Sequence, residues 1–397
     1  MPTNKPALRR VFYTTFAHTA IDFYMLLSPP LWAFFKTHFS LTLSQVAILP
    51  SVVSVCGSIT QPFMGYLGDR RNRMALVALG VLICAVFVSS IGFAPSAPIL
   101  ALLLIAASMG SSLFHPNAGG LVTRLLPERS NMAMAIFLTG GTLGMAIAPI
   151  VGTQIIARHG LEKIWIIIFP GLILSAFLYL ASRKSAPEEI EKAPARFDLS
   201  ILRTRAMRPL LVLYAISVFR SLIHSGFVSF TALLGESWGW STGKIGWVFS
   251  GYLLASTAGR MVGGYLGDRV SPRKLLAFSN ATSAPFHIGF CLFPGPAAIP
   301  LFFIAGFLFD LGITTTIVLA QRVLPQNTST ATGLVMGFAW GAAGLMIPLI
   351  GKLAELTSIA DALIVVSLSL IPATILVVLL PTEISTQTEP AKATADD

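Results

Sequence analysis

Ionisable side chains occur inside stretches of this chain that are otherwise apolar. His18 and Asp22 are four residues apart, and so are Arg220 and His224, which places each pair on one face of a helix. An ionisable group at the centre of a bilayer costs about 2.5–3.5 kcal/mol on insertion scales, so each is a candidate functional group in an aqueous cavity. Three further residues in the same setting are His115, Arg260 and Asp310.

Carboxylate, imidazole and guanidinium groups in one cavity suit proton transfer and the binding of an anion. We expect Asp22 to carry a coupling proton, because a poorly hydrated cavity favours the protonated carboxyl group, and His18 to share or relay that proton. Arg220 can hold an anionic substrate with two parallel hydrogen bonds, since a guanidinium stays charged. Asp310 is either a second proton site or the ion-pair partner of Arg220.

Each candidate also has a purely structural interpretation. Asp310 and Arg220 can form an interhelical ion pair without touching substrate, and His115 can bond a backbone carbonyl beside Pro116. His224 can pack passively, and Arg260 can brace helix packing. Further candidates for the pocket lining are Ser111, Phe114, Tyr24 and Trp340.

The composition predicts what positions these residues. Hydrophobic residues make up 54% of the chain and charged residues 11%, against roughly a quarter charged in soluble domains. Apolar stretches of about 20 residues, long enough to cross a bilayer as helices, recur along the whole chain. We expect an all-α integral membrane protein with twelve transmembrane helices. The predicted segments are 11–35, 44–67, 74–94, 98–126, 131–157, 161–182, 208–234, 243–267, 274–294, 298–324, 329–356 and 359–381.

An internal repeat divides the chain into halves. The hexapeptide from Gly65 to Arg70 recurs unchanged from Gly264 to Arg269, and Pro149 has its counterpart in Pro348 at the same spacing. Many secondary transporters are built from such duplicated units. The repeat predicts two pseudo-symmetric six-helix bundles joined by a charged linker and followed by a polar tail that we expect to be disordered. The predicted limits are 1–182, 183–207, 208–381 and 382–397.

The basic residues report topology. The net charge is +10, but Lys and Arg gather in the segments expected on one side of the membrane, which is the bias that orients helices rather than a sign of nucleic-acid binding. Both termini are therefore predicted to be cytoplasmic, and the first segment shows no cleavable signal peptide. We expect a multi-pass protein of a bacterial inner membrane, monomeric, contacting lipids and without a cofactor.

Glycines and charges gather where the second apolar segment of each half ends. Such a cluster can latch one end of the protein, because the glycines allow close helix approach and the charges pair across helices. The residues concerned are Gly65, Asp69, Arg70 and Arg73, with Asp268 and Arg269 in the second copy. This arrangement resembles the signature Gly-x-Leu-x-Asp-Arg-x-x-Arg of the major facilitator superfamily.

A second motif lies in the fifth segment. Gly144, Ala148, Pro149 and Gly152 resemble the antiporter motif Gly-x-x-x-Gly-Pro-x-x-Gly of the same superfamily, with Ala148 in place of a glycine. Small residues and a proline allow a close helix contact. The resemblance implies the major facilitator fold and favours antiport.

A narrower similarity lies in the fourth and tenth segments. The residues from Gly110 to Pro116 and from Ala320 to Pro325, with His18 followed by Asp22, resemble the fosmidomycin-resistance subgroup of bacterial drug exporters. This resemblance implies proton-coupled export of a small molecule and a central cavity lined by helices 1, 4, 7 and 10. The mixture of His, Arg and Asp suits a zwitterionic or anionic substrate.

Two other functions stay open from the sequence. Imidazole and carboxylate together also suit a divalent metal or a metal chelate as the transported species. The ligands in that case would be His18, Asp22, His115, His224 and Asp310. An integral-membrane enzyme is a weaker alternative, because neither a nucleophile elbow nor a His-Glu-x-x-His motif is present.

Overall fold

The computed structural model describes residues 5–68, 71–125, 130–183, 207–267, 269–323, 331 and 333–380, and these residues form helices joined by short connections. The first half contains α1 (Lys5–Leu27), η1 (Pro29–Leu31), α2 (Trp32–His38), α3 (Leu43–Gly68), α4 (Arg73–Ser89), η2 (Ile91–Phe93), α5 (Ala97–Leu125), α6 (Ser130–His159), η4 (Leu161–Ile167) and α7 (Ile168–Arg183). The second half contains α8 (Met207–Ser237), α9 (Thr242–Gly267), α10 (Pro272–Leu292), α11 (Ala298–Asp310), α12 (Ile313–Val323), η6 (Gly333–Phe338), α14 (Ala339–Leu356), α15 (Ile359–Leu368) and α16 (Leu370–Val378).

Nine of the described helical stretches are long and apolar enough to cross a membrane. The predicted segments outside this set fall on α1 with α2, on α9 and on α10, all of which carry polar and charged side chains. The protein is therefore a multi-pass, all-helical membrane protein over its described residues. The full count of twelve spans stays a prediction.

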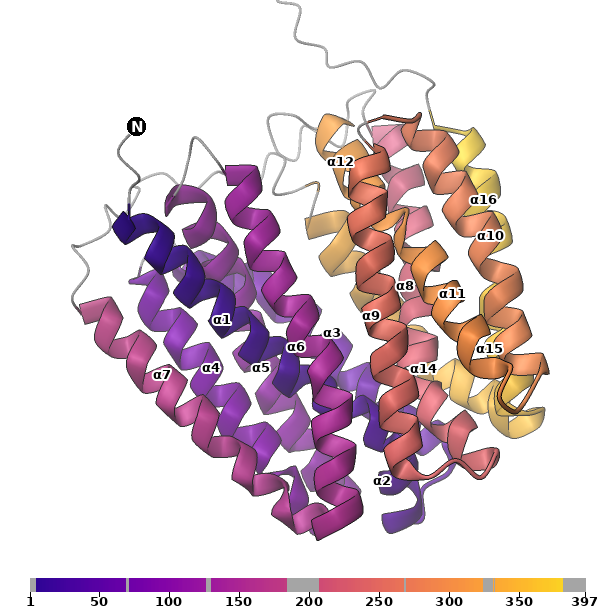
Figure 1. Ribbon diagram of the computed structural model, residues 1–397, viewed down its shortest axis with the longest axis horizontal. Coiled ribbons are helices and arrows are strands. Elements are labelled where there is room, and N and C mark those ends of the chain that lie inside the picture. Colours follow the sequence, from indigo (N-terminus) through magenta and orange to yellow (C-terminus); the bar gives the residue numbers. More distant parts are fainter. Residues whose placement is uncertain are drawn as a thin grey trace, which may run out of the picture.

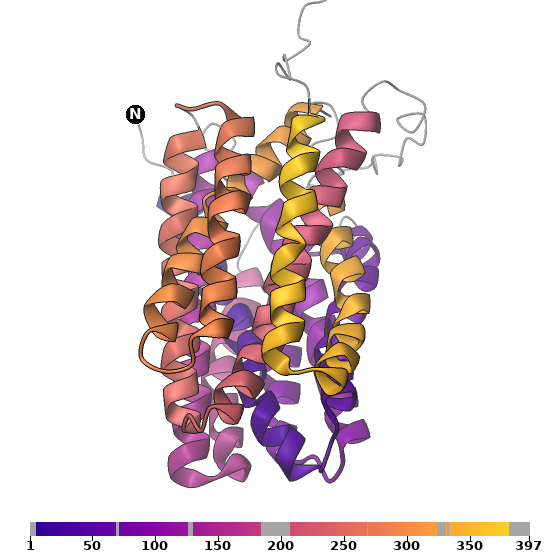
Figure 2. The same cartoon turned by 90° about the vertical axis from the view of Figure 1, so that its right-hand side faces the viewer.

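The helices gather into two groups that follow the order of the chain (Figure 1). In the first group, α1 packs against α6, α5 and α4, while α4 also packs against α5 and α7. In the second group, α8 packs against α14 and α16, and α11 packs against α9 and α10. Figure 2 shows α10 and α16 side by side on the face of the second group that points away from the first.

Two seams join the groups, one between α3 and α14 and one between α6 and α9. Close approach at the second seam requires a residue without a side chain. A Cβ atom on Gly246 of α9 would lie 2.8 Å from the carbonyl oxygen of Pro149 on α6. At the first seam, the Ser54 hydroxyl donates to the carbonyl oxygen of Trp340 over 3.0 Å.

Polar contacts tie the groups together at the end where α3 begins and α14 finishes. The backbone N–H of Ser44 donates to the Glu355 carboxylate over 2.8 Å, which places an anion at the positive N-terminus of α3. The Thr37 hydroxyl of α2 donates to the Glu236 carboxylate of α8 over 3.1 Å. Both contacts cross from one half to the other: the first lies in the α3–α14 seam, and the second forms where η1 and α2 lie against α8.

The predicted antiporter motif lies along α6, where that helix packs against α1. A Cβ atom on Gly144 would lie 2.0 Å from the carbonyl oxygen of Thr19, so glycine sets the distance between the two backbones. Gly152 faces Leu27 further along α1, and α6 continues through Pro149. The predicted linker and tail fall outside the described residues except at positions 183 and 207.

Candidate functional site

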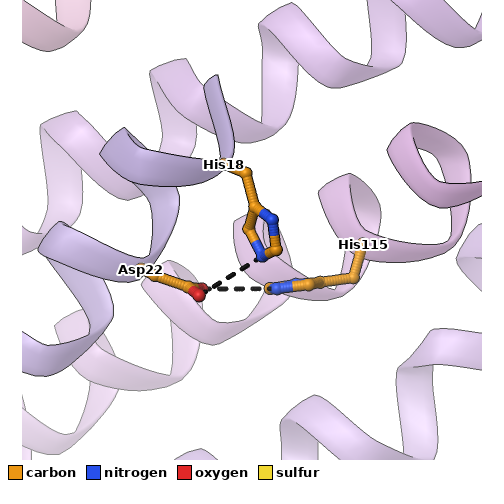
Figure 3. Close-up of side chains that lie close together, drawn as sticks. All are labelled: His18, Asp22 and His115. Atoms are coloured by element: carbon orange, nitrogen blue, oxygen red, sulfur yellow. Dashed lines mark ion pairs between the residues drawn. The ribbon is translucent and has the colours of Figure 1, made fainter. Parts of the chain in front are cut away.

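Three ionisable side chains from two helices converge inside the first half (Figure 3). The carboxylate of Asp22 lies between two imidazoles, with Oδ2 3.3 Å from Nε2 of His18 and Oδ1 3.3 Å from Nε2 of His115. His18 and Asp22 come from successive turns of α1, and His115 comes from α5. We call these three residues the triad. The i, i+4 spacing on α1 brings His18 and Asp22 together, whereas packing of α1 on α5 adds His115.

Backbone carbonyls orient both imidazoles of the triad. Nδ1 of His18 lies 2.8 Å from the carbonyl oxygen of Phe137 on α6, and Nδ1 of His115 lies 2.9 Å from that of Ser111. A carbonyl oxygen only accepts hydrogen bonds, so each Nδ1 carries a hydrogen and donates it. In a neutral ring the lone pair is then on Nε2, which faces Asp22 in both cases.

The triad is enclosed on most sides. His18 and Asp22 are 3% and 4% exposed, whereas the side chain of His115 keeps 31% of its surface accessible. The ring of Phe137 stacks on His18 at 4.0 Å between centroids, and Phe114 packs beside both. Access to the acid from outside the packed helices is therefore on the side of His115.

Gly141 of α6 makes room for the triad. A Cβ atom at this position would lie 2.6 Å from Asp22 Oδ2 and 2.6 Å from His18 Nε2. The sequence motif predicted a close contact between two helices, and at Gly141 the atoms in contact belong to His18 and Asp22. The sequence placed Gly141 beside the antiporter motif but did not indicate that it faces His18 and Asp22.

The second half holds a different arrangement of charges. Arg260 of α9 pairs with Asp310 at the end of α11 over 2.7 Å, where the arginine side chain is 34% exposed and the aspartate is buried. The expected ion pair between Asp310 and Arg220 is not the one that forms. Arg220 instead lies between α10 and α11, where its partners are Asn280, Ser279 and the carbonyl oxygen of Phe309.

Arg220 is thus held by neutral acceptors and by an aromatic ring. Its guanidinium carbon lies 4.3 Å from the centroid of the Phe309 ring, and the residue is 3% exposed. Because the guanidinium is buried and bonded to α10 and α11, it braces three helices in this structure. Arg260 is the more accessible of the two cations.

The remaining predicted ligands are spread out. His224 packs on Trp340 at 5.1 Å between centroids, next to the seam with α3. The five-residue metal set is therefore divided, since Asp310 pairs with Arg260. Within the described residues, a group that could hold a metal ion consists of His18, Asp22 and His115.

Three of the predicted lining residues, Tyr24, Phe114 and Ser111, have structural contacts. The Tyr24 hydroxyl donates to the carbonyl oxygen of Ile167 over 2.7 Å and is buried. Phe114 is fully buried against the triad, and the Ser111 hydroxyl lies 3.2 Å from Nδ1 of His115.

The predicted latch is described in part. Asp69, Arg70 and Asp268 lie outside the described residues. Gly65 faces Pro116 of α5, since a Cβ there would lie 3.4 Å from that ring. Arg73 is buried beside α5, and Arg269 is exposed with its guanidinium carbon 3.6 Å from the centroid of the Tyr265 ring.

A row of polar residues on α10 was not predicted from the sequence. His287 is fully buried, with Nδ1 3.0 Å from the carbonyl oxygen of Ser283 and Nε2 3.5 Å from the Tyr252 hydroxyl. Ser279 and Asn280 lie on the same helix and contact Arg220. The recurrence of polar residues at helical spacing inside an apolar segment could have indicated that this face of the helix packs inside the bundle.

The profile of the Major Facilitator Superfamily matches residues 13–234 and 213–396, so it covers both halves. The chain belongs to the major facilitator superfamily. The Fosmidomycin resistance protein of Escherichia coli strain K12 is 25% identical over 350 residues, which cover 86% of each chain. An uncharacterised transporter of the superfamily, YfnC of Bacillus subtilis, is 24% identical over 362 residues, or 88% of this chain and 87% of its own. The predicted resemblance is thereby confirmed.

Solved structures of superfamily members share the fold. A bacterial homologue of the human lysosomal transporter Spinster, in an inward-facing and occupied conformation, superposes with a TM-score of 0.79 at 16% identity. The match covers 93% of this chain and 96% of that protein. A transporter of the POT family in complex with a thioalcohol-conjugated peptide gives a TM-score of 0.78 at 14% identity, covering 95% and 96%. At these identities the likeness establishes the fold alone.

Proposed function

We propose that this superfamily member is a secondary active transporter that exchanges cytoplasmic substrate for external protons by alternating access. The substrate is a small anionic or zwitterionic molecule. The observation that carries the proposal is the triad, in which a carboxylate buried among apolar helices faces two imidazoles and is accessible past His115. Ionisable groups in such a place cost insertion free energy, so their presence supports a functional role.

The proton is carried by Asp22 together with His18 and His115. Because both Nδ1 atoms donate to carbonyl oxygens, a neutral imidazole would turn its lone pair toward the carboxylate. This lone pair and the carboxylate repel each other, and a proton shared between Nε2 and the carboxylate removes the repulsion. The geometry of the triad therefore favours proton binding. Asp310 is a second protonatable group, and its protonation would free Arg260 for substrate.

The substrate site lies on the accessible sides of His115 and Arg260, with His224 and Trp340 beside it. Arg260 supports this proposal because its side chain is 34% exposed, and a guanidinium binds carboxylate or phosphate groups in two parallel hydrogen bonds. Arg220, which the sequence favoured for this role, positions α10 and α11 instead. The name of the relative in Escherichia coli suggests a phosphonate antibiotic, fosmidomycin, as the first compound to test.

Two bundles, residues 1–182 and 208–381, rock about the proposed site, with 183–207 as the linker and 382–397 as the tail. The seams support this division. The repeat maps α3 onto α9 and α6 onto α14, so the α3–α14 and α6–α9 contacts exchange when the halves are exchanged. Both termini are cytoplasmic in this proposal, the protein is a monomer, and the membrane is the bacterial inner membrane.

The test compares cells that express the chain with cells that express Asp22→Asn. The parent chain should raise the inhibitory concentration of fosmidomycin or of another exported compound found in the same screen, whereas Asp22→Asn should not. Glu162→Gln, at an exposed acid in η4, serves as the matched control and should behave like the parent. Membrane levels of all three chains are measured in parallel.

Transport in proteoliposomes then tests coupling directly. A pH gradient should drive movement of the compound through the parent chain, and it should not through Asp22→Asn. Recovery of chemically unchanged compound on the other side of the membrane would exclude the enzymatic alternative. Equal pH-driven transport in Asp22→Asn and the parent would refute the role given to Asp22.

A further inference from the structure

We propose that the triad is also a binding site for one Zn²⁺ ion, held by Nε2 of His18, Nε2 of His115 and the carboxylate of Asp22. One potential ligand atom from each residue lies within 4.8 Å of the other two. Two imidazoles and one carboxylate match the three-ligand sets of zinc sites that keep a fourth position open.

The distances favour a cation as the occupant. A hydrogen bond between a charged imidazole and a carboxylate is typically about 2.7–2.9 Å long. Both nitrogen-to-oxygen contacts of the triad are longer, at 3.3 Å. Bonds of about 2.0–2.1 Å arranged as a tetrahedron around zinc separate neighbouring ligand atoms by roughly 3.3 Å. Each contact to Asp22 therefore has the length of a tetrahedral edge. The two contacts end on different carboxylate oxygens, Oδ2 for His18 and Oδ1 for His115, so a small rotation of the carboxylate would present one oxygen to the ion.

Backbone carbonyls orient both histidines for metal binding. Zinc-bound histidines usually donate their other ring hydrogen to a carbonyl or carboxylate, which fixes the tautomer and the ring orientation. His18 and His115 both do so, to the carbonyls of Phe137 and Ser111. Their Nε2 lone pairs thus point toward Asp22 before any ion arrives. Gly141 lets α6 pack closely against these ligands, since a Cβ there would lie 2.6 Å from Asp22 Oδ2.

The chemistry of the ligands selects the ion. Imidazole nitrogen suits zinc, cobalt and nickel, whereas magnesium and calcium prefer oxygen ligands. The accessible side of His115 gives the ion an entry path and leaves its fourth position to water. In one respect the inference rests on the proposed function: an ion on these atoms would exclude the coupling proton, so Zn²⁺ should inhibit transport.

Binding is tested on the purified full-length chain in detergent, isolated through a tag without histidines. Calorimetric titration with Zn²⁺ should show one high-affinity equivalent, and Co²⁺ should give the visible absorption of a nitrogen-coordinated ion. His115→Gln should weaken Zn²⁺ binding at least about tenfold. His159→Gln, an exposed histidine at the end of α6, is the matched control and should bind like the parent. Mg²⁺ should not bind at the triad.

A second ligand variant guards against loss of folding. Asp22→Asn removes the carboxylate with little change in shape and should lose the Zn²⁺-dependent rise in thermal unfolding temperature that the parent shows. Equal Zn²⁺ affinity in the parent and in both ligand variants would overturn the inference, as would absence of binding to the parent.

Transport measurements separate this inference from the proposed function. Zn²⁺ binding that needs the triad, together with unchanged proton coupling in Asp22→Asn, would refute the coupling role and leave the ion site standing. Loss of coupling in Asp22→Asn without any Zn²⁺ binding to the parent would refute the ion site alone.

Discussion

Replacement of Gly141 by alanine tests whether α6 controls the geometry of the triad. The added Cβ would lie 2.6 Å from Asp22 Oδ2 and 2.6 Å from His18 Nε2, so these side chains must move. The neighbouring Gly140 and Gly144 face backbone oxygens of Thr15 and Thr19, where a methyl group would separate the helices. At Gly141 the strain falls on the functional pair itself.

The expected magnitude follows from the cost of overpacking. An extra methyl group in a tightly packed site costs roughly 1–3 kcal/mol. If that energy displaces Asp22 from His18, proton-driven transport should fall by roughly 5- to 150-fold, since about 1.4 kcal/mol changes a rate tenfold. The thermal unfolding temperature should fall only modestly, because alanine favours the helix by roughly 0.5–1 kcal/mol over glycine and so offsets part of that cost.

The assay is pH-driven transport in proteoliposomes across a range of external pH, with unfolding temperature as the check on folding. Gly119→Ala on α5 is the matched control, because its Cβ would meet only the end of Met134 at 4.0 Å. That variant should transport like the parent. A folded Gly141→Ala variant with the parent's rate and pH profile would refute the argument that this glycine makes room for the coupling pair.

Three further substitutions address other contacts. Asp310→Asn removes the counter-charge of Arg260, so substrate affinity measured by equilibrium binding should rise and its dependence on pH should weaken. Unchanged binding would argue against competition between Asp310 and substrate for Arg260. Glu355→Gln weakens the hydrogen bond that the Ser44 amide donates across the α3–α14 seam, so the seam should open more often. Chemical labelling of a cysteine placed in this seam should then become faster, and an unchanged labelling rate would show that this contact does not control opening. Tyr24→Phe loses one buried hydrogen bond, so it should lower stability by about 1 kcal/mol in a denaturant titration while transport persists, and lost transport in a folded variant would place this hydroxyl in the pocket.

Local spacing explains which parts of the site the sequence could predict. His18 and Asp22 are one helical turn apart, so their contact follows from the helix alone. His115 reaches the same carboxylate from α5, and no spacing in the sequence fixes how deep one helix lies against another. The repeat predicted helices in equivalent positions, as the exchange of α3–α14 with α6–α9 illustrates.

Partner choice in the second half shows the limit of that reasoning. The sequence analysis offered Arg220 as the possible partner of Asp310 and gave Arg260 a role in helix packing, whereas the pair that forms is Arg260 with Asp310. The choice depends on where each long side chain finds acceptors. Arg220 is satisfied by oxygens of α10 and α11, and Arg260 reaches the carboxylate from α9. Contacts of this kind are decided by the packing of three or four helices at once.

The repeat also shows that the two halves hold different side chains at equivalent positions. The residues that correspond to His18 and Asp22 in α8 are Ser217 and Ser221, both buried and neither able to bind a proton at physiological pH. The second half has its buried acid, Asp310, on α11 and pairs it with a cation. A duplicated scaffold thus carries an acid with two imidazoles on one side and an acid with a guanidinium on the other. Proton uptake in the first half and anion binding in the second can then share one pair of rocking bundles, which is the physical requirement for exchanging the two across a membrane.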